Sequence, residues 1–335
     1  LHLKKWSAAL LTGLLGTCAS VTAQLATYTY ETDAYLLAML LACAAVWCSR
    51  RLPRLWGYAG AAVCLCGCLA LYQSYIQFAV GLYLLLLLQS ALQGAEWRPW
   101  LRQGVGALLT LALGAVLYVV SLKVSLALTG YQLADTGNGL AQMFRLGPAA
   151  VLGGIPATYG NFFKTLLGYS GWNDRGMRAA TALLFVLAAL AGLRWLVVLH
   201  DRKAAAAAVV LVALLPAAAN VTDVINTGAT VALRMAGSLA IVVPFAIAVI
   251  DAAPALTERA FSCGMALCTA FCAVLLRGFA VQVNNDAAVM LKQKTTVVNL
   301  ANRLCTRLEE NADYQNGAEV VILGEPKRGA YPEES

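Results

Sequence analysis

The sequence predicts an all-α polytopic membrane protein with about nine transmembrane helices and a small external αβ appendage at its carboxyl end. Three observations support this fold class. Sixty per cent of the 335 residues are hydrophobic and only 12% are charged, and the mean hydropathy is +0.70, a composition typical of chains that lie in lipid. The apolar residues form runs close to the length of a bilayer crossing. Basic residues gather in every second turn between these runs.

The nine membrane segments follow one another through short turns, except for one long interruption after residue 128. Residues 55–92 show the pattern best. There an apolar run, a short polar stretch and a second apolar run give enough length for two crossings at roughly 20 residues each. The predicted segments are 7–26, 33–49, 55–72, 76–92, 104–128, 179–199, 204–219, 232–250 and 260–277.

Basic residues determine the expected orientation. By the positive-inside rule the turns that hold them are cytoplasmic, so we expect a multi-pass protein of the cell membrane with its amino end cytoplasmic and its carboxyl end extracytoplasmic. These turns hold most of the net charge of +7, and no basic stretch with interleaved aromatic residues points to nucleic acid. The residues are Lys4, Lys5, Arg50, Arg51, Arg54, Arg98, Arg102, Arg202, Lys203 and Arg259.

Two parts of the chain differ from the membrane segments. Within a transmembrane domain at 1–278, the external segment 129–178 is too long for a simple connection, and its apolar patches at 148–155 and 162–167 predict two short re-entrant or interfacial helices. The remainder, 279–335, is predicted to be an extracytoplasmic appendage. It has helical apolar spacing over 284–311 and a strand-like run at 319–323.

The polar stretch at residues 71–78, LYQSYIQF, predicts a tight hairpin between two membrane helices. Tyr72, Gln73, Tyr75 and Gln77 place polar groups where a purely structural turn would use Gly, Pro or Asn. We therefore expect a binding site at one membrane face. The alternative is a satisfied surface turn with interfacial tyrosines.

The order of several stretches resembles the Gtr type-II glucosyltransferase family, which includes the serotype-converting O-antigen glucosyltransferases. An aromatic and acidic stretch leads into a helix (TYTYETDAYLLAMLLA), a basic turn and the YQSYIQFA hairpin follow, and NTGATVALRM comes late. The tail runs from VNNDAAVMLKQKT to VVILG. The resemblance covers nearly the whole chain, and YQSYIQFA carries it most strongly.

The resemblance implies a GT-C-like membrane enzyme. Such an enzyme takes a sugar, usually glucose in this family, from a polyprenyl-phosphate carrier in the membrane lipid. It transfers the sugar to a cell-surface polysaccharide on the outer face. Companion proteins, a donor synthase and a flippase, would make and translocate the lipid-linked sugar. The need for a divalent metal stays open, and no metal-binding residue is assigned.

The chain begins with Leu1 rather than Met, and we expect it to be an N-terminally truncated fragment. In GT-C enzymes the catalytic acids are expected in the first external loop, which would then precede Leu1, and the fragment would be inactive alone. Two other functions fit the same pattern. One is a transporter or flippase of lipid-linked glycans, and the other is a glycan polymerase.

Transfer from a lipid phosphate needs a carboxylate that deprotonates the acceptor hydroxyl and groups that stabilise the departing phosphate. Glu31 and Asp33, at an external helix start, are the candidate catalytic residues, with helix capping as the alternative. Tyr72, Gln73 and their neighbours in the hairpin would hydrogen-bond to a sugar ring and stack on it.

Three further residues are candidates for substrate binding. Lys123 and Arg234 are ionisable residues within apolar segments, where charges are costly unless they serve a function, and either would pair with the carrier phosphate. Snorkelling to the interface is the alternative for both. Asp223 lies in the next external loop, where it would bind substrate or form a salt bridge with Arg234.

Overall fold

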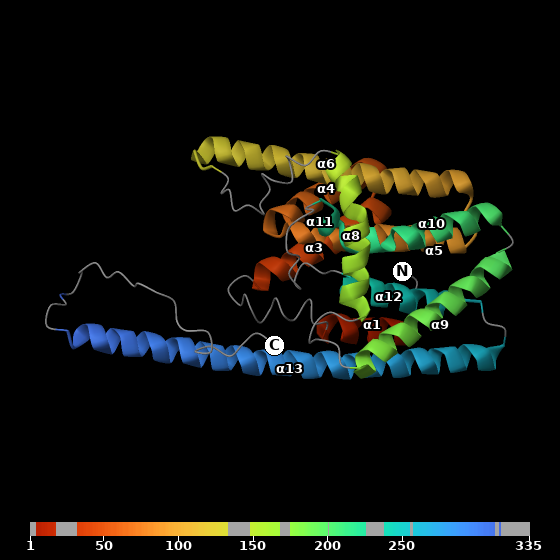
Figure 1. Ribbon diagram of the computed structural model, residues 1–335. Coiled ribbons are helices and arrows are strands. Elements are labelled where there is room, and N and C mark those ends of the chain that lie inside the picture. The colour runs from red at the N-terminus through yellow and green to blue at the C-terminus, as the bar shows by residue number, and fades with distance from the viewer. Residues whose placement is uncertain are drawn as a thin grey trace. The chain divides into compact units, whose positions relative to one another are not determined.

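The computed structural model describes residues 5–17, 32–132, 148–167, 175–199, 201–225, 238–254, 257–311 and 315. Its regular elements are all helical, and no strand occurs within these ranges (Figure 1). The elements are α1 (Lys5–Thr17), α3 (Thr32–Arg51), α4 (Arg54–Leu71), η2 (Gln73–Tyr75), α5 (Ile76–Leu92), α6 (Trp97–Thr129), α8 (Pro148–Leu167), α9 (Arg175–Leu199), α10 (Arg202–Ala219), α11 (Val221–Ile225), α12 (Ser238–Ala252) and α13 (Glu258–Glu309).

Seven helices in the described ranges are long and apolar enough to cross a membrane: α3, α4, α5 with its leading turn, α6, α9, α10 and α13. Each corresponds to a predicted segment, which confirms the all-α membrane class. The other two predicted segments coincide with shorter helices. α1 ends at Thr17 and the rest of 7–26 lies outside the described residues, while α12 covers only the later part of 232–250.

The bundle centre is α5, the most buried of the seven candidate spans. It packs against α3, α6, α10 and α12, while α3 packs on α4 and α4 on α6. Figure 1 shows α5 and α10 running alongside each other. Small residues permit the close contacts. A Cβ added at Gly57 of α4 would lie 3.0 Å from the carbonyl oxygen of Cys48, and one at Gly114 of α6 would lie 2.5 Å from the Leu65 Cβ.

The apolar patches at 148–155 and 162–167 form one helix rather than two. α8 runs without a break from Pro148 to Leu167 and contains Pro156. It crosses α10 instead of running parallel to it (Figure 1) and contacts α9, α11 and α12 as well. The expectation of two short helices is therefore wrong. A proline inside a helix removes one backbone donor, and here the helix is supported by packing against four neighbouring helices.

The chain divides into two compact units, residues 1–279 and 280–335. α13 is a single helix of 52 residues that extends across this division. Cys268, Cys272, Leu275 and Phe279 form its buried stripe in the first unit. The helical spacing at 284–311 is thus real, but the expected separate helix is a continuation of the last membrane helix. The predicted strand at 319–323 lies outside the described residues.

Candidate functional site

The turns of the bundle separate into two ends of different chemistry. We call the first turn of α3, the η2 turn and α11 the aromatic end, because α3 and α11 both contact η2. The opposite turns, α3–α4 and α5–α6, form the basic end, where Arg50, Arg54 and Arg102 line one cavity. The expected alternation of basic and non-basic turns therefore holds for these helices in three dimensions.

At the aromatic end the backbone groups of the hairpin form hydrogen bonds with one another. Tyr72 is extended (φ −157°, ψ 105°), and its N–H donates to the carbonyl oxygen of Cys68 at 2.9 Å. The Tyr75 N–H donates to the Tyr72 carbonyl oxygen at 3.1 Å, which closes the turn. Because backbone groups make these bonds, the polar side chains of the turn are not needed as caps.

Aromatic rings hold the turn against α3. The Tyr35 ring of α3 meets the Tyr72 ring edge to face, with centroids 4.8 Å apart, and Tyr72 meets Tyr75 in the same way at 5.1 Å. Tyr75 also contacts Phe78 of α5 at 5.0 Å. Such edge-to-face pairs contribute about 0.5–1.5 kcal/mol each beyond the area they bury. The three tyrosines thus form one cluster from α3 and the turn, with Phe78 of α5 beside it.

Burial divides the four predicted sugar-binding residues of the hairpin into two pairs. Tyr75 and Gln77 are 4% and 0% exposed, so in this conformation they support the site from inside the bundle. Tyr72 and Gln73 are half-buried, but the Tyr72 hydroxyl itself is buried. In this conformation Tyr72 is able to contact a substrate through its ring and Gln73 through its side chain.

Gln73 connects the turn to α6. Its Nε2 donates to the Tyr118 hydroxyl at 2.9 Å, and this bond fixes the amide at the rim of the site. Lys123 lies five residues further along α6 and is exposed. Five residues correspond to a rotation of about 140° around the helix axis, so Lys123 does not share the face that Tyr118 presents to Gln73.

A buried carboxylate lies next to the same turn. Asp223 in α11 is 7% exposed, and its Oδ2 accepts a hydrogen bond from the Asn161 Nδ2 of α8 at 3.0 Å. Because α11 contacts both η2 and α5, this carboxylate belongs to the aromatic end. The expected partner Arg234 lies outside the described residues, and the partner that the structure shows is Asn161.

Of the two candidate catalytic acids near the start of α3, the structure describes only Asp33. Asp33 is exposed, and its Oδ1 accepts from the backbone N–H of the next residue, Ala34, at 2.9 Å. It lies two residues before Tyr35, so its backbone adjoins the tyrosine cluster. Glu31 lies outside the described residues. No group of three His, Cys, Asp or Glu residues able to hold a metal occurs in the described part of the chain.

Sequence reasoning missed three residues of this site: Tyr35, Tyr118 and Asn161. Tyr35 was visible in the stretch TYTYETDAY but has no chemistry that separates it from an interfacial tyrosine. Tyr118 and Asn161 are polar groups within apolar helices, and this is the signal that indicated Lys123 and Arg234. A search for uncharged polar residues at such positions would have found both.

The fold and the site define a helical membrane protein with a polar, aromatic site at one end of its bundle. The family described as glucosyl transferase GtrII matches residues 1–245, which is well over half of the 335 residues. The chain therefore belongs to the GtrII glucosyl transferase family, as its motifs predicted. Comparison with curated proteins and with solved structures found no match.

Proposed function

We propose that this glucosyl transferase moves a sugar, most simply glucose, from a polyprenyl-phosphate donor to a surface polysaccharide. The observation that carries the proposal is the family match over residues 1–245. The aromatic end is the proposed place of reaction, on the outer face of the membrane, with the amino end of the chain cytoplasmic and the carboxyl end outside. A donor synthase and a flippase would supply the lipid-linked sugar.

In the proposed step the acceptor hydroxyl oxygen bonds to the anomeric carbon of the donor. The bond from that carbon to the phosphate oxygen breaks, polyprenyl phosphate leaves, and a carboxylate takes the hydroxyl proton. Asp223 supports this site best, because it is a buried carboxylate beside the turn. Asp33 and Glu31 are the other proposed acids.

The remaining proposed roles concern substrate binding. Tyr72 and Gln73 contact the sugar at the surface of the turn, while Tyr75 and Gln77 hold the turn from inside. Lys123 and Arg234 are proposed to attract the carrier phosphate, for which a guanidinium offers a bidentate fork. An exposed lysine is able to swing toward a phosphate because its stem has four rotatable carbons.

Reconstitution of the full-length protein in proteoliposomes tests the proposal. We expect labelled glucose to pass from polyprenyl-phosphate glucose to purified acceptor polysaccharide, and no acceleration of lipid exchange between leaflets. Accelerated exchange of the lipid-linked sugar without transfer would instead identify a flippase. Extension of the polysaccharide by whole repeat units would identify a polymerase.

A further inference from the structure

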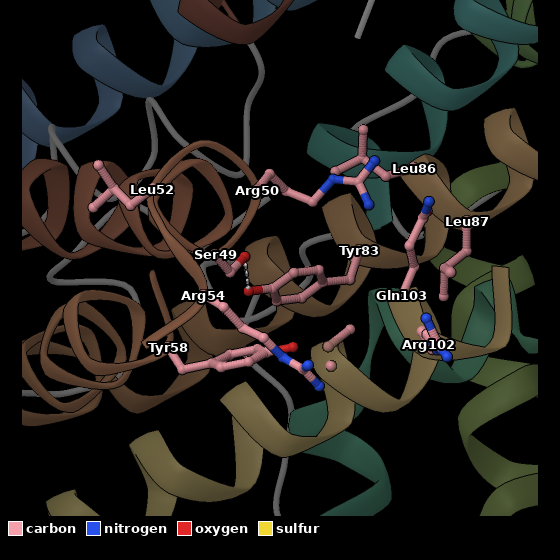
Figure 2. A pocket seen from close by; sticks show the side chains of 12 residues that line it. Ser49, Arg50, Leu52, Arg54, Tyr58, Tyr83, Leu86, Leu87, Arg102 and Gln103 are labelled. Carbon is pink, nitrogen blue, oxygen red and sulfur yellow. Dashed lines mark hydrogen bonds between the residues drawn. The ribbon is translucent and has the colours of Figure 1, made fainter. Parts of the chain in front are cut away.

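The basic end of the bundle holds a cavity that sugar transfer at the aromatic end does not use. It has a volume of about 340 Å³ and lies between the α3–α4 and α5–α6 hairpins (Figure 2). α5 continues nine residues beyond Tyr83, about 13 Å at 1.5 Å per residue, whereas α3 ends two residues after Ser49. The α3–α4 hairpin is therefore recessed, and the recess forms the cavity.

Three guanidinium groups from three helices line this cavity, and none of the described residues that line it carries a carboxylate. Arg50 ends α3, Arg54 begins α4 and Arg102 lies in the second turn of α6. Figure 2 shows their side chains around the cavity, with the hydrogen-bonded Ser49–Tyr83 pair between them. Like charges around one space repel each other, and an anion inside the cavity would relieve that repulsion.

The hydroxyls of Ser49 and Tyr83 are engaged with each other and with the backbone, so they supply no donor for an anion. The Ser49 hydroxyl donates to the Val46 carbonyl oxygen at 2.9 Å. Its 2.8 Å contact with the Tyr83 hydroxyl therefore takes the proton of Tyr83. Neither hydroxyl has a second proton to offer. The guanidinium groups, with five donors each in a planar fork, match the oxygens of a phosphate.

A second cavity adjoins the charged cavity along α3 and α5. It has a volume of about 750 Å³ and shares Ser49, Arg50, Leu86 and Gln103 with the first cavity. Part of its lining is polar, with Arg51, Gln89, Ser90 and Gln93. The other part, which we call the α3–α5 groove, suits a hydrocarbon chain and consists of Cys43, Val46, Trp47 and Leu82. A cationic pocket joined to such a groove in a membrane protein matches an amphiphile with a phosphate head and lipid tails.

We propose that the basic end binds the phosphate headgroup of a lipid, with Arg50, Arg54 and Arg102 holding the phosphate and the α3–α5 groove holding a lipid chain. This site is separate from the sugar-transfer site, which lies at the other end of α3 and α5. Two kinds of lipid carry this headgroup chemistry. One is a bilayer phospholipid, and the other is a polyprenyl phosphate.

The matched control is Arg98. It belongs to the same basic turn as Arg102 and, like the three cavity arginines, is exposed, but it lines neither cavity. General attraction between a basic surface and anionic lipid would weaken equally on removal of either charge. In contrast, the affinity of a specific phosphate-binding site would depend on the three cavity arginines and not on Arg98.

The test is lipid titration of the detergent-purified protein, followed by native mass spectrometry. The probes are dioleoylphosphatidic acid, dioleoylphosphatidylglycerol, undecaprenyl phosphate and, as the zwitterionic comparison, dioleoylphosphatidylcholine. We expect R50Q/R54Q/R102Q to bind the phosphate lipids at least about tenfold more weakly than the unaltered protein, which corresponds to about 1.4 kcal/mol. R98Q should change binding less than about twofold.

Preference for undecaprenyl phosphate would support the proposal and identify the carrier lipid as the occupant. Equal binding of the diacyl lipids would support it and identify a phospholipid. Equal loss in R98Q and the triple variant, or binding of phosphatidylcholine as strong as that of phosphatidic acid, would overturn it. Should the triple variant fail to fold, the single change R102Q and the lipid preference of the unaltered protein decide the same question.

Discussion

The Asp223 carboxylate provides the sharpest test of the aromatic end. Asp223→Asn keeps the size of the side chain and an oxygen that accepts from Asn161, so the helix contacts of α11 stay in place. The change removes the negative charge from a residue that is only 7% exposed. We expect the protein to fold and to transfer sugar more slowly.

The magnitude follows from the hydrogen bonds that a charged oxygen makes. A bond from a sugar hydroxyl to a carboxylate contributes about 1.5–3 kcal/mol, and each 1.36 kcal/mol corresponds to about a tenfold change in rate. If Asp223 only binds the sugar, kcat/KM should fall roughly 10- to 150-fold. If it also removes the acceptor proton, the loss extends to about 10²–10⁴-fold.

The assay is the initial rate of labelled glucose transfer from polyprenyl-phosphate glucose in proteoliposomes. Asp201→Asn is the matched control. Asp201 is also a carboxylate at a helix boundary, but its Oδ1 accepts from the Lys203 N–H at 2.8 Å and begins α10 at the basic end. A rate for Asp223→Asn within about twofold of both the control and the unaltered protein would refute the reasoning.

Three further changes test the packing of the bundle and of its aromatic end. Gln73→Leu combined with Tyr118→Phe in a double-mutant cycle should give a coupling of about 0.5–1.5 kcal/mol in unfolding free energy, and a coupling of zero would mean that their 2.9 Å bond does not hold the turn. Gly114→Leu should destabilise by at least about 1–3 kcal/mol through overpacking against α4, whereas Gly264→Ala, with open space around it, should not lower the melting temperature. Tyr35→Leu should cost about 1–3 kcal/mol because it loses its ring contacts with Tyr72 and Tyr75, and it should slow transfer. Tyr35→Phe keeps the ring and should keep thermal stability. An unchanged melting temperature for Tyr35→Leu would contradict the role of these ring contacts in holding the turn.

The membrane helices could be predicted because their signal is local. A run of apolar residues of sufficient length has few other stable states in lipid than a helix, and the prediction at 76–92 coincides with α5 (Ile76–Leu92). The prediction at 55–72 differs from α4 (Arg54–Leu71) by one residue at each end. The basic turns likewise lie in the sequence itself, so their grouping at one end followed from simple alternation.

Two predicted helix boundaries were wrong. In both places the composition of the sequence changes, but the helix continues. The apolar patches at 148–155 and 162–167 were expected to be separate helices, yet α8 runs through Pro156, because a helix supported by neighbours tolerates the loss of one backbone donor. After Phe279 the sequence becomes polar, and we expected a new element there. The polar stretch contains no proline, so α13 continues. What changes at that point is the surroundings of the helix and not its geometry.

The site was predicted as separate residues, and its arrangement was not. Asn161 and Asp223 are 62 residues apart in the chain, and no sequence pattern pairs an amide in one helix with a carboxylate in another. Tyr35 and Tyr72 meet only because α3 packs on α4 with the turn above them. Such contacts depend on helix rotation and crossing, which small residues such as Gly57 and Gly114 set through close approach.

Helix α5 gives both ends of the bundle a common support. Tyr75 precedes its first residue in the aromatic cluster, and Tyr83 lies in the wall of the basic cavity. Eight residues separate the two, about 12 Å along a helix axis, which is well under the roughly 30 Å of a bilayer core. Tyr83 lies near the middle of α5 (Ile76–Leu92), so the cavity reaches the middle of this candidate span. Because α5 is the most buried of the candidate spans, it cannot shift at the basic cavity without also moving the turn that holds Tyr72 and Gln73. A lipid that fills the groove beside α5 would accordingly stabilise the packing on which the aromatic end depends, even though the two sites bind different molecules.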